Sequence, residues 1–328
     1  MGAGLTLVEG SSKLFGRSIF KNYLLDSIAM SALVVTTAEY GIGAAVLLLV
    51  AYRLQILGLV RHTEPRPQRL RLTWQAVTAI AVLGGCNLMG RGLMALAMTS
   101  GTALATINAI TFAVSTMTYS KEVWQTGQRF AAMLVPLLIV LGLAVSIEAW
   151  HITVRPWGVI WSIGSALSGI IYMALSRSYV DRGGADADQF QALSTSLGVV
   201  GLAVWAKLAG EDPSVGWSWE VLLALLCTAL MTVVVPRYLH VRARRALGDA
   251  VYTILWSVIP LLGLLVDLIM EQKIPTIWQV VGMSWISVIA AGASLLRLPP
   301  EARATQRRKF RRAVKRLKKL FGCGSAYG

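Results

Sequence analysis

The strongest constraint on this sequence is a succession of uninterrupted apolar runs, each close to 20 residues long. Examples are residues 30–51, 131–147 and 251–270. A helix of about 20 residues crosses the roughly 30 Å of hydrocarbon in a bilayer, whereas the apolar residues of soluble helices and strands recur with periods of 3.6 and 2. The sequence therefore predicts an all-α protein that crosses a membrane many times.

Composition and charge support this prediction. Of the 328 residues, 55% are hydrophobic and 14% are charged, compared with about 45–50% and about 25% in soluble domains. The net charge of +15 would suggest nucleic-acid binding in a soluble protein, but most basic residues lie between the apolar runs and in the C-terminal tail. We therefore expect no nucleic-acid partner. Three widely separated cysteines suggest neither a disulfide framework nor a zinc site, and we expect no metal or cofactor.

The apolar runs predict nine spans and leave the N-terminal segment, residues 1–27, undecided. This segment carries four ionisable residues, each of which would cost about 2.5 to 3.5 kcal/mol at the centre of a lone helix. We expect either an interfacial helix or a weak, incomplete first span, which gives nine to ten transmembrane helices. The nine predicted spans are 28–51, 73–97, 101–119, 130–148, 156–176, 190–209, 219–236, 249–270 and 277–296.

The distribution of basic residues predicts the orientation of the spans. One set of alternate connections, together with the tail, holds 24 Lys and Arg residues, among them Arg237, and the other set holds 4. Lys and Arg are retained on the cytoplasmic side of short loops. The C-terminus is therefore expected in the cytoplasm, and the protein in the cytoplasmic (plasma) membrane.

An internal repeat is indicated by two similarly spaced sets of residues. In each set, the first residue lies near the end of a helix and the second in a turn. The third lies in an acidic loop after the next span, and the fourth lies in a further span. The spacings are 10, 21 and 20 in the first set and 11, 23 and 21 in the second. If the N-terminal segment counts as a span, each half has five, and an odd number makes the halves inverted relative to each other. The two sets are Arg91, Gly101, Glu122, Gly142 and Arg237, Gly248, Glu271, Gly292.

These boundaries divide the chain into four parts. Residues 28–148 form the first transmembrane repeat and residues 149–298 form the second. The N-terminal segment precedes them, and residues 299–328 form a basic cytoplasmic tail. In this tail, Arg303 to Lys319 contains ten basic residues with apolar residues at near-helical spacing, which predicts an amphipathic helix on the anionic leaflet. Membrane lipids are therefore expected partners.

Several stretches resemble the EamA-type ten-helix members of the drug/metabolite transporter superfamily. Residues 157–180 are similar to the opening span of that family's second repeat. Within residues 247–296, the order of a mid-span proline, an acidic turn and a closing glycine is similar to the family pattern, and residues 97–112 resemble the matching first-half stretch. The positions are Ile259-Pro260, Glu271, Gln279, Gly282, Gly292 and Glu122. The resemblance implies inverted five-helix repeats, a central cavity and export or exchange of amino acids or related metabolites.

The chain departs from the family pattern at three places. Phe112 stands where the first repeat would have proline, so we expect a less kinked helix there. The first span is weak or truncated, and Glu39 occupies a mid-span position that is often arginine in the family.

Glu39 and Arg91 are the main candidates for the chemistry of the site. An ionised carboxylate in mid-span is costly and is a functional candidate by default, so Glu39 is a candidate proton-coupling or substrate-amine site. Arg91 is a candidate ligand for a substrate carboxylate. The alternatives are a structural pair between the two residues and an Arg91 side chain that reaches the interface.

Polar amides and aromatic rings complete the candidate substrate site. Asn87 and Asn108 are either substrate ligands or hydrogen bonds between helices. Four aromatic residues are either the wall of a cavity or packing residues. They are Tyr40, Tyr172, Tyr252 and Trp256.

Two functions remain open at this point. The first is a secondary transporter, exporter or exchanger, whose partner is a small-molecule substrate. The second is a membrane-embedded interaction or regulatory protein with the transporter fold. We do not expect an enzyme, because the sequence shows no Ser/His/Asp set, no metal cluster and no glycine-rich phosphate loop. A second copy of the chain, forming a homodimer, is a further candidate partner.

Overall fold

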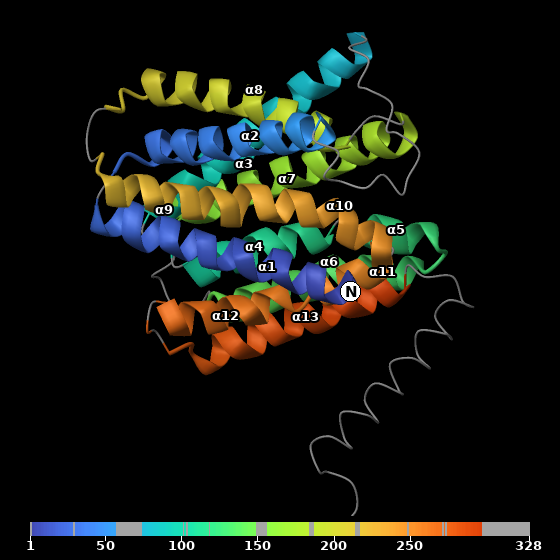
Figure 1. Ribbon diagram of the computed structural model, residues 1–328. Helices are drawn as coiled ribbons and strands as arrows, with labels where there is room; N and C mark the ends of the chain where they lie inside the picture. Colours follow the sequence, from blue (N-terminus) through green and yellow to red (C-terminus); the bar gives the residue numbers. More distant parts are fainter. Residues whose placement is uncertain are drawn as a thin grey trace, which may run out of the picture.

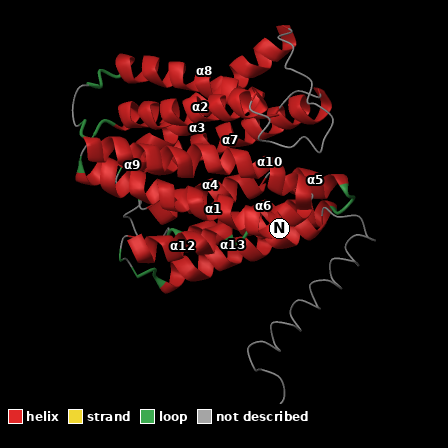
Figure 2. Cartoon of the chain, in the orientation of Figure 1, coloured by secondary structure: helices red, strands yellow, loops and turns green. Residues whose placement is uncertain are grey.

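The computed structural model describes a helical bundle with no strand among its described residues (Figure 2). Eight helices are long and apolar enough to cross a membrane. Together these findings show an all-α, multi-pass membrane protein. The described residues are 2–28, 30–56, 74–100, 102, 104–117, 119–148, 156–183, 187–213, 217–247, 249–270, 272 and 274–296.

The helices lie side by side in one bundle (Figure 1). Two π-helical segments, η1 and η2, interrupt the α-helices. In chain order the elements are α1 (Gly2–Ile19), η1 (Phe20–Ser27), α2 (Ala32–Ile56), α3 (Trp74–Thr99), α4 (Leu104–Met117), α5 (Tyr119–Gln125), α6 (Arg129–Ser146), α7 (Pro156–Gly183), α8 (Ala187–Leu208), α9 (Trp219–Ala229), η2 (Leu230–Val234), α10 (Val235–Leu247), α11 (Asp249–Trp256), α12 (Ile259–Met270) and α13 (Ile277–Leu296).

Each of the nine predicted spans corresponds to one helix or to consecutive helical elements, although several begin or end at other residues than predicted. The span predicted at 101–119 is the shorter helix α4 of 14 residues. The span predicted to end at residue 236 continues as α10 to Leu247. Arg237 therefore lies within helix α10 and inside the candidate span Trp219–His240, and not in a connection between helices.

The N-terminal segment packs against the rest of the bundle. α1 runs along α10 and α12 and also contacts α9, η2 and α11 (Figure 1). Thr6, Glu9, Leu14 and Arg17 are buried along it. Whether the segment crosses the membrane fully stays a prediction, but its polar side chains face the interior of the bundle.

The remaining packing joins helices that are distant in sequence. α3 packs against α7 and α8, α2 packs against α8 and α9, and α6 packs against α13. α4 lies between the two halves of the chain, where it contacts α6, α7 and α12. The core is therefore shared by both halves, and neither half has a core of its own.

The bundle exposes large apolar side chains on its outside and buries several polar and charged side chains among the apolar ones of its core, whereas soluble proteins keep charged residues mostly exposed. On α6 the outward side chains Phe130, Met133 and Leu137 are 76%, 66% and 64% exposed. Glu39 and Asn87 are only 2% and 7% exposed. A contiguous apolar exterior of this kind suits lipid contact and would promote aggregation in water, whereas buried ionisable groups are functional candidates.

Proline distinguishes the corresponding helices of the two halves. The chain turns at Ser257 and Val258 between α11 and α12, and Pro260 occupies the first turn of α12, a position where its missing N–H group is tolerated. Phe112 lies within α4, which runs without a break from Leu104 to Met117. α4 is thus uninterrupted at Phe112, and the smaller kink expected there stays a prediction.

Glycine allows α6 and α13 to approach closely. A Cβ atom at Gly282 would lie 2.4 Å from the backbone nitrogen of Ser146, and one at Gly142 would lie 2.6 Å from a ring carbon of Trp285. Small residues at such crossings let helix backbones meet in membranes, where there is little hydrophobic force between helices. These two glycines fix the distance between the last spans of the two halves.

Candidate functional site

Glu39 and Arg91 meet at Thr232, in the π-helical segment η2. The Thr232 hydroxyl donates to the Glu39 carboxylate, and Arg91 Nη2 donates to the Thr232 carbonyl oxygen over 2.8 Å. A π-helical turn rearranges the regular backbone hydrogen bonds, and such turns are frequent at functional sites. The Glu39 carboxylate and the Arg91 guanidinium do not approach within 4.0 Å, so the two share Thr232 instead of forming an ion pair.

Arg237 forms a second polar centre from α10. Its guanidinium donates to Asn87 Oδ1 over 2.6 Å, to the Thr195 hydroxyl, and to Tyr40 Oη over 3.5 Å. It also lies 5.5 Å from the centroid of the Tyr172 ring. Arg237 therefore joins α2, α3, α7 and α8 at one point.

Tyr40 connects the two arginines. Its ring centroid lies 4.9 Å from the guanidinium carbon of Arg91 and 5.7 Å from that of Arg237. An aromatic face attracts cations, most strongly when both are removed from water. The fully buried Tyr40 thus stabilises both positive charges without neutralising either.

Arg17, on α1, forms a third polar centre with Asn108 of α4. Its Nη1 donates to Asn108 Oδ1 over 2.6 Å. An arginine has only donors, so the amide oxygen of Asn108 must face it and the amide nitrogen must point elsewhere. That nitrogen, Nδ2, and Arg17 Nε are both buried without a hydrogen-bond partner.

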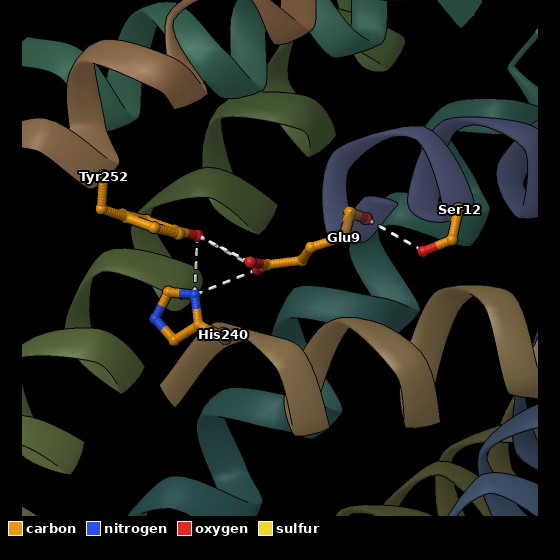
Figure 3. Close-up of polar contacts among 4 residues, drawn as sticks. All are labelled: Glu9, Ser12, His240 and Tyr252. Atoms are coloured by element: carbon orange, nitrogen blue, oxygen red, sulfur yellow. Dashed lines mark hydrogen bonds and ion pairs between the residues drawn. The ribbon is translucent and has the colours of Figure 1, made fainter. Parts of the chain in front are cut away.

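A fourth polar group lies nearer the N-terminus of α1 (Figure 3). Tyr252 Oη lies 3.1 Å from both carboxylate oxygens of Glu9 and 2.8 Å from His240 Nδ1, which is itself 3.1 Å from Glu9 Oε1. Ser12 donates to the Glu9 carbonyl oxygen over 3.0 Å. A carboxylate, an imidazole and a phenol in mutual contact can pass a proton among themselves.

Trp256 links this group to the rest of α1. Its ring stacks on Tyr252 with centroids 5.6 Å apart, and Lys13 Nζ lies 5.8 Å from the Trp256 ring. Glu9, Lys13 and Arg17 follow one another at intervals of four, so α1 presents them along one side. They form a row of ionisable groups that runs along the helix.

A narrow pocket opens beside Glu39. Its lining combines charged and hydroxyl groups with methionine and small apolar side chains. The space open to the centre of a water-sized sphere is about 10 Å³, which is close to what one water molecule needs. The helices must therefore separate before this pocket holds a metabolite. The lining residues are Arg17, Phe20, Thr36, Glu39, Arg91, Met94, Ala95, Met98 and Thr232.

The eight candidate residues fall into connected groups. One group surrounds the guanidinium groups of Arg91 and Arg237, and its candidate residues are Arg91 itself, Glu39, Tyr40, Asn87 and Tyr172. The other three candidates lie nearer α1. Asn108 contacts Arg17, and Tyr252 with Trp256 adjoins the Glu9 group. These positions are compatible with the predicted roles and do not test them. Gly101, Gly248, Glu271 and the tail from residue 297 onward lie outside the described residues.

Sequence reasoning missed several polar residues of this interior. Arg237 was counted as a loop residue, and the ionisable residues of α1 were treated only as a cost of insertion. The four-residue spacing on α1 was a usable signal, because it places the charges on one side of a helix. Thr195 and Thr232 gave no signal, since threonine is common in membrane helices. The missed residues are Glu9, Lys13, Arg17, Thr195, Thr232, Arg237 and His240.

Comparison with known proteins identifies a fold and no family. No family model and no curated protein matches the chain. A solved structure described only as "Crystal structure of protein" is 18% identical, with a TM-score of 0.57, and the match covers 90% of this chain and 97% of the other. At this identity the likeness shows a shared fold over nearly the whole length of both chains, and nothing about a substrate.

Proposed function

We propose that this protein is a secondary transporter of small metabolites, such as amino acids or related compounds. The observation that carries the proposal is the row of polar and charged side chains inside a bundle whose outside is apolar. Buried ionisable groups are expensive in a membrane protein, and they mark the pathways of substrates and ions. The interior groups come from helices of both halves, as in transporters whose site lies between two repeats.

The packing of the helices supports two equivalent five-helix units. We pair α1 with α7, α2 with α8, α3 with α9–α10, α4 with α11–α12, and α6 with α13. Under this pairing, the contact of α3 with α7 corresponds to the contact of α10 with α1. The contact of α3 with α8 corresponds to that of α9 with α2, and the contact of α4 with α7 corresponds to that of α12 with α1. The α2–α8 and α6–α13 contacts turn into themselves. Such exchange is expected of a pseudo-two-fold axis.

The two central arginines are equivalent under the same exchange. Arg91 lies on α3 and Arg237 on α10, and both guanidinium groups approach the Tyr40 ring. Five spans in each unit would orient the units oppositely, which makes the repeat an inverted one. Rocking of one unit against the other would then open the narrow pocket to each side of the membrane in turn.

The resemblance to EamA-type drug/metabolite transporters suggests the direction and the location. It favours export or exchange across the plasma membrane, with the C-terminus in the cytoplasm. Removing Arg237 from the loop residues leaves the excess of basic residues on the proposed cytoplasmic side intact. A regulatory protein with the same fold is the competing proposal, favoured by the pocket that has room for only one water molecule.

Flux in proteoliposomes tests the proposal. Purified protein is reconstituted, loaded with unlabelled amino acids and organic acids, and supplied outside with the same compounds in labelled form. A transporter accumulates label by exchange, and the rate saturates. Glu39→Gln should abolish this exchange or remove its dependence on pH, whereas Glu220→Gln, on the exposed first turn of α9, should leave it intact. Absence of exchange for every compound, with a folded protein, would favour the regulatory function.

A further inference from the structure

The charges inside the bundle do not balance. Arg17 and Arg91 line the narrow pocket together with Glu39, and Arg91 and Arg237 both approach the Tyr40 ring. Within the described part of the chain, none of the three guanidinium groups has a carboxylate oxygen within 4.0 Å. On α1, Glu9 is engaged by His240 and Tyr252, and its formal charge offsets that of Lys13, which also acts on the three arginines. The formal charge of this arginine cluster, with Glu39, is +2.

An unbalanced charge in a low-dielectric interior is unfavourable, because neither water nor a counter-ion compensates it. Threonine, asparagine and tyrosine groups contact the three arginines, but these groups are neutral. A bound anion of charge −2 would bring the cluster to neutrality. Guanidinium groups are well suited to this task, because their planar donors match the oxygens of carboxylates and phosphates.

Three of the unused hydrogen-bonding groups around the cluster are donors only, and a fourth, Tyr172 Oη, is a hydroxyl that can donate or accept. Arg17 Nε, Asn108 Nδ2 and Asn87 Nδ2 are buried without a partner, and their residues are 8%, 7% and 7% exposed. Asn87 faces Arg237 with its oxygen, as Asn108 faces Arg17, so in both cases the nitrogen is the atom left over. Buried donors without acceptors are rare in native proteins, and a ligand rich in oxygen acceptors would satisfy them.

We propose that the solute bound at Arg17, Arg91 and Arg237 is a small organic dianion, a dicarboxylate or a phosphate monoester. The proposal rests on the transport function proposed above and narrows its substrate class. Arg17 and Arg91 line the narrow pocket and hold one anionic group there, and Arg237, which also approaches the Tyr40 ring, holds the second. A zwitterionic amino acid would leave the formal charge of the cluster unchanged at +2.

Thermal unfolding in nanodiscs of phosphatidylcholine, a zwitterionic lipid without net charge, tests binding without requiring transport. The probes are succinate and glycerol 3-phosphate, with succinamide, glycerol and alanine as matched neutral or zwitterionic controls. The dianions should raise the unfolding temperature in a saturable manner, and the controls should not. A larger effect of alanine or succinamide than of both dianions would overturn the proposal, and so would stabilisation by added phosphatidylglycerol alone, which would identify a lipid headgroup as the ligand.

Substitutions locate the site. Arg91→Gln and Arg17→Gln should each weaken dianion binding roughly ten- to a hundredfold, the loss expected for one hydrogen-bonded charge. Arg91→Lys keeps the charge and should retain part of the affinity. Arg129→Gln removes an exposed arginine at the start of α6 and should change nothing. Equal affinity in the Arg17, Arg91 and Arg129 variants would overturn the assignment, and the wild-type comparison of probes stands even if one variant fails to fold.

Flux of the same probes separates this proposal from the function on which it rests. Saturable dianion binding without exchange would uphold the anion site and refute the transporter. Exchange of alanine but not of succinate or glycerol 3-phosphate would uphold the transporter and refute the dianion. Exchange of a dianion that Arg91→Gln abolishes and Arg129→Gln preserves would support both.

Discussion

Truncating Asn87 should destabilise the protein more than replacing the arginine that Asn87 contacts. Asn87 is buried, and its Oδ1 accepts from the partly buried Arg237 over 2.6 Å. Asn87→Ala leaves the guanidinium charge in place and removes one of its acceptors, whereas Arg237→Met removes the charge together with its need for acceptors. Leaving a charge without one of its acceptors costs more than leaving neutral acceptors without their donor.

The expected magnitudes follow from the hydrogen bond. A hydrogen bond to a charged group contributes roughly 1.5–3 kcal/mol, while interhelical hydrogen bonds in membranes average about 0.6 kcal/mol. We expect Asn87→Ala to lower the free energy of unfolding by about 2 kcal/mol in the wild-type background. In the Arg237→Met background the same change should cost less than about 0.6 kcal/mol, because the methionine side chain has no donor that needs the Asn87 acceptor. The coupling between the two positions is therefore expected to exceed roughly 1 kcal/mol.

The double-mutant cycle is measured by reversible unfolding in mixed micelles, titrated with dodecyl sulfate and followed by the helical circular dichroism signal. Asn22→Ala serves as the control, because the Asn22 amide donates to the uncharged Ser18 hydroxyl, over 3.2 Å. It should show no coupling with Arg237→Met. If Asn87→Ala has the same cost in both backgrounds, the Arg237–Asn87 contact does not stabilise the fold and the reasoning is refuted.

Three further predictions concern packing, the Glu9 group and topology. Gly282→Leu should lower the free energy of unfolding by more than about 2 kcal/mol, because the new side chain meets the α6 backbone. Gly292→Leu should lower it little, because no atom lies within 4 Å of the Cβ position there. The same micelle titration measures both variants, and equal losses would contradict the close crossing of α6 and α13. Tyr252→Phe removes the hydroxyl contacts of Figure 3 but keeps the ring, so unfolding should become about 1 kcal/mol easier, and an unchanged midpoint would show that the hydroxyl is not needed. Cysteines introduced at Arg66 and Arg244 should react with an impermeant thiol reagent from the same side of the membrane, and labelling from opposite sides would refute the proposed topology.

The sequence determined the fold class and most of the helix positions, because crossing a bilayer imposes both a length and a composition on each segment. The runs at 131–147 and 277–296 could be read directly as α6 and α13, and Phe112 correctly indicated an unbroken α4. Glu39, Asn87 and Arg91 stood out because polar side chains are rare within such runs.

The tertiary structure alone decided which polar side chains meet. Arg237 is at the edge of an apolar run, where its sequence is equally typical of a loop. Only the approach of α10 to α8 and the packing of α8 against α2 and α3 bring it to Asn87 and Tyr40. Glu9, Lys13 and Arg17 read as an obstacle to insertion because their cost was judged for a helix alone. Packed in the bundle, they face partners from α4, α10 and α11 that lie between 91 and 243 residues away in the sequence. The hydropathy of a segment reflects whether the outer side of its helix contacts lipid or water. The partners of its inner side depend on how the helices are arranged in space.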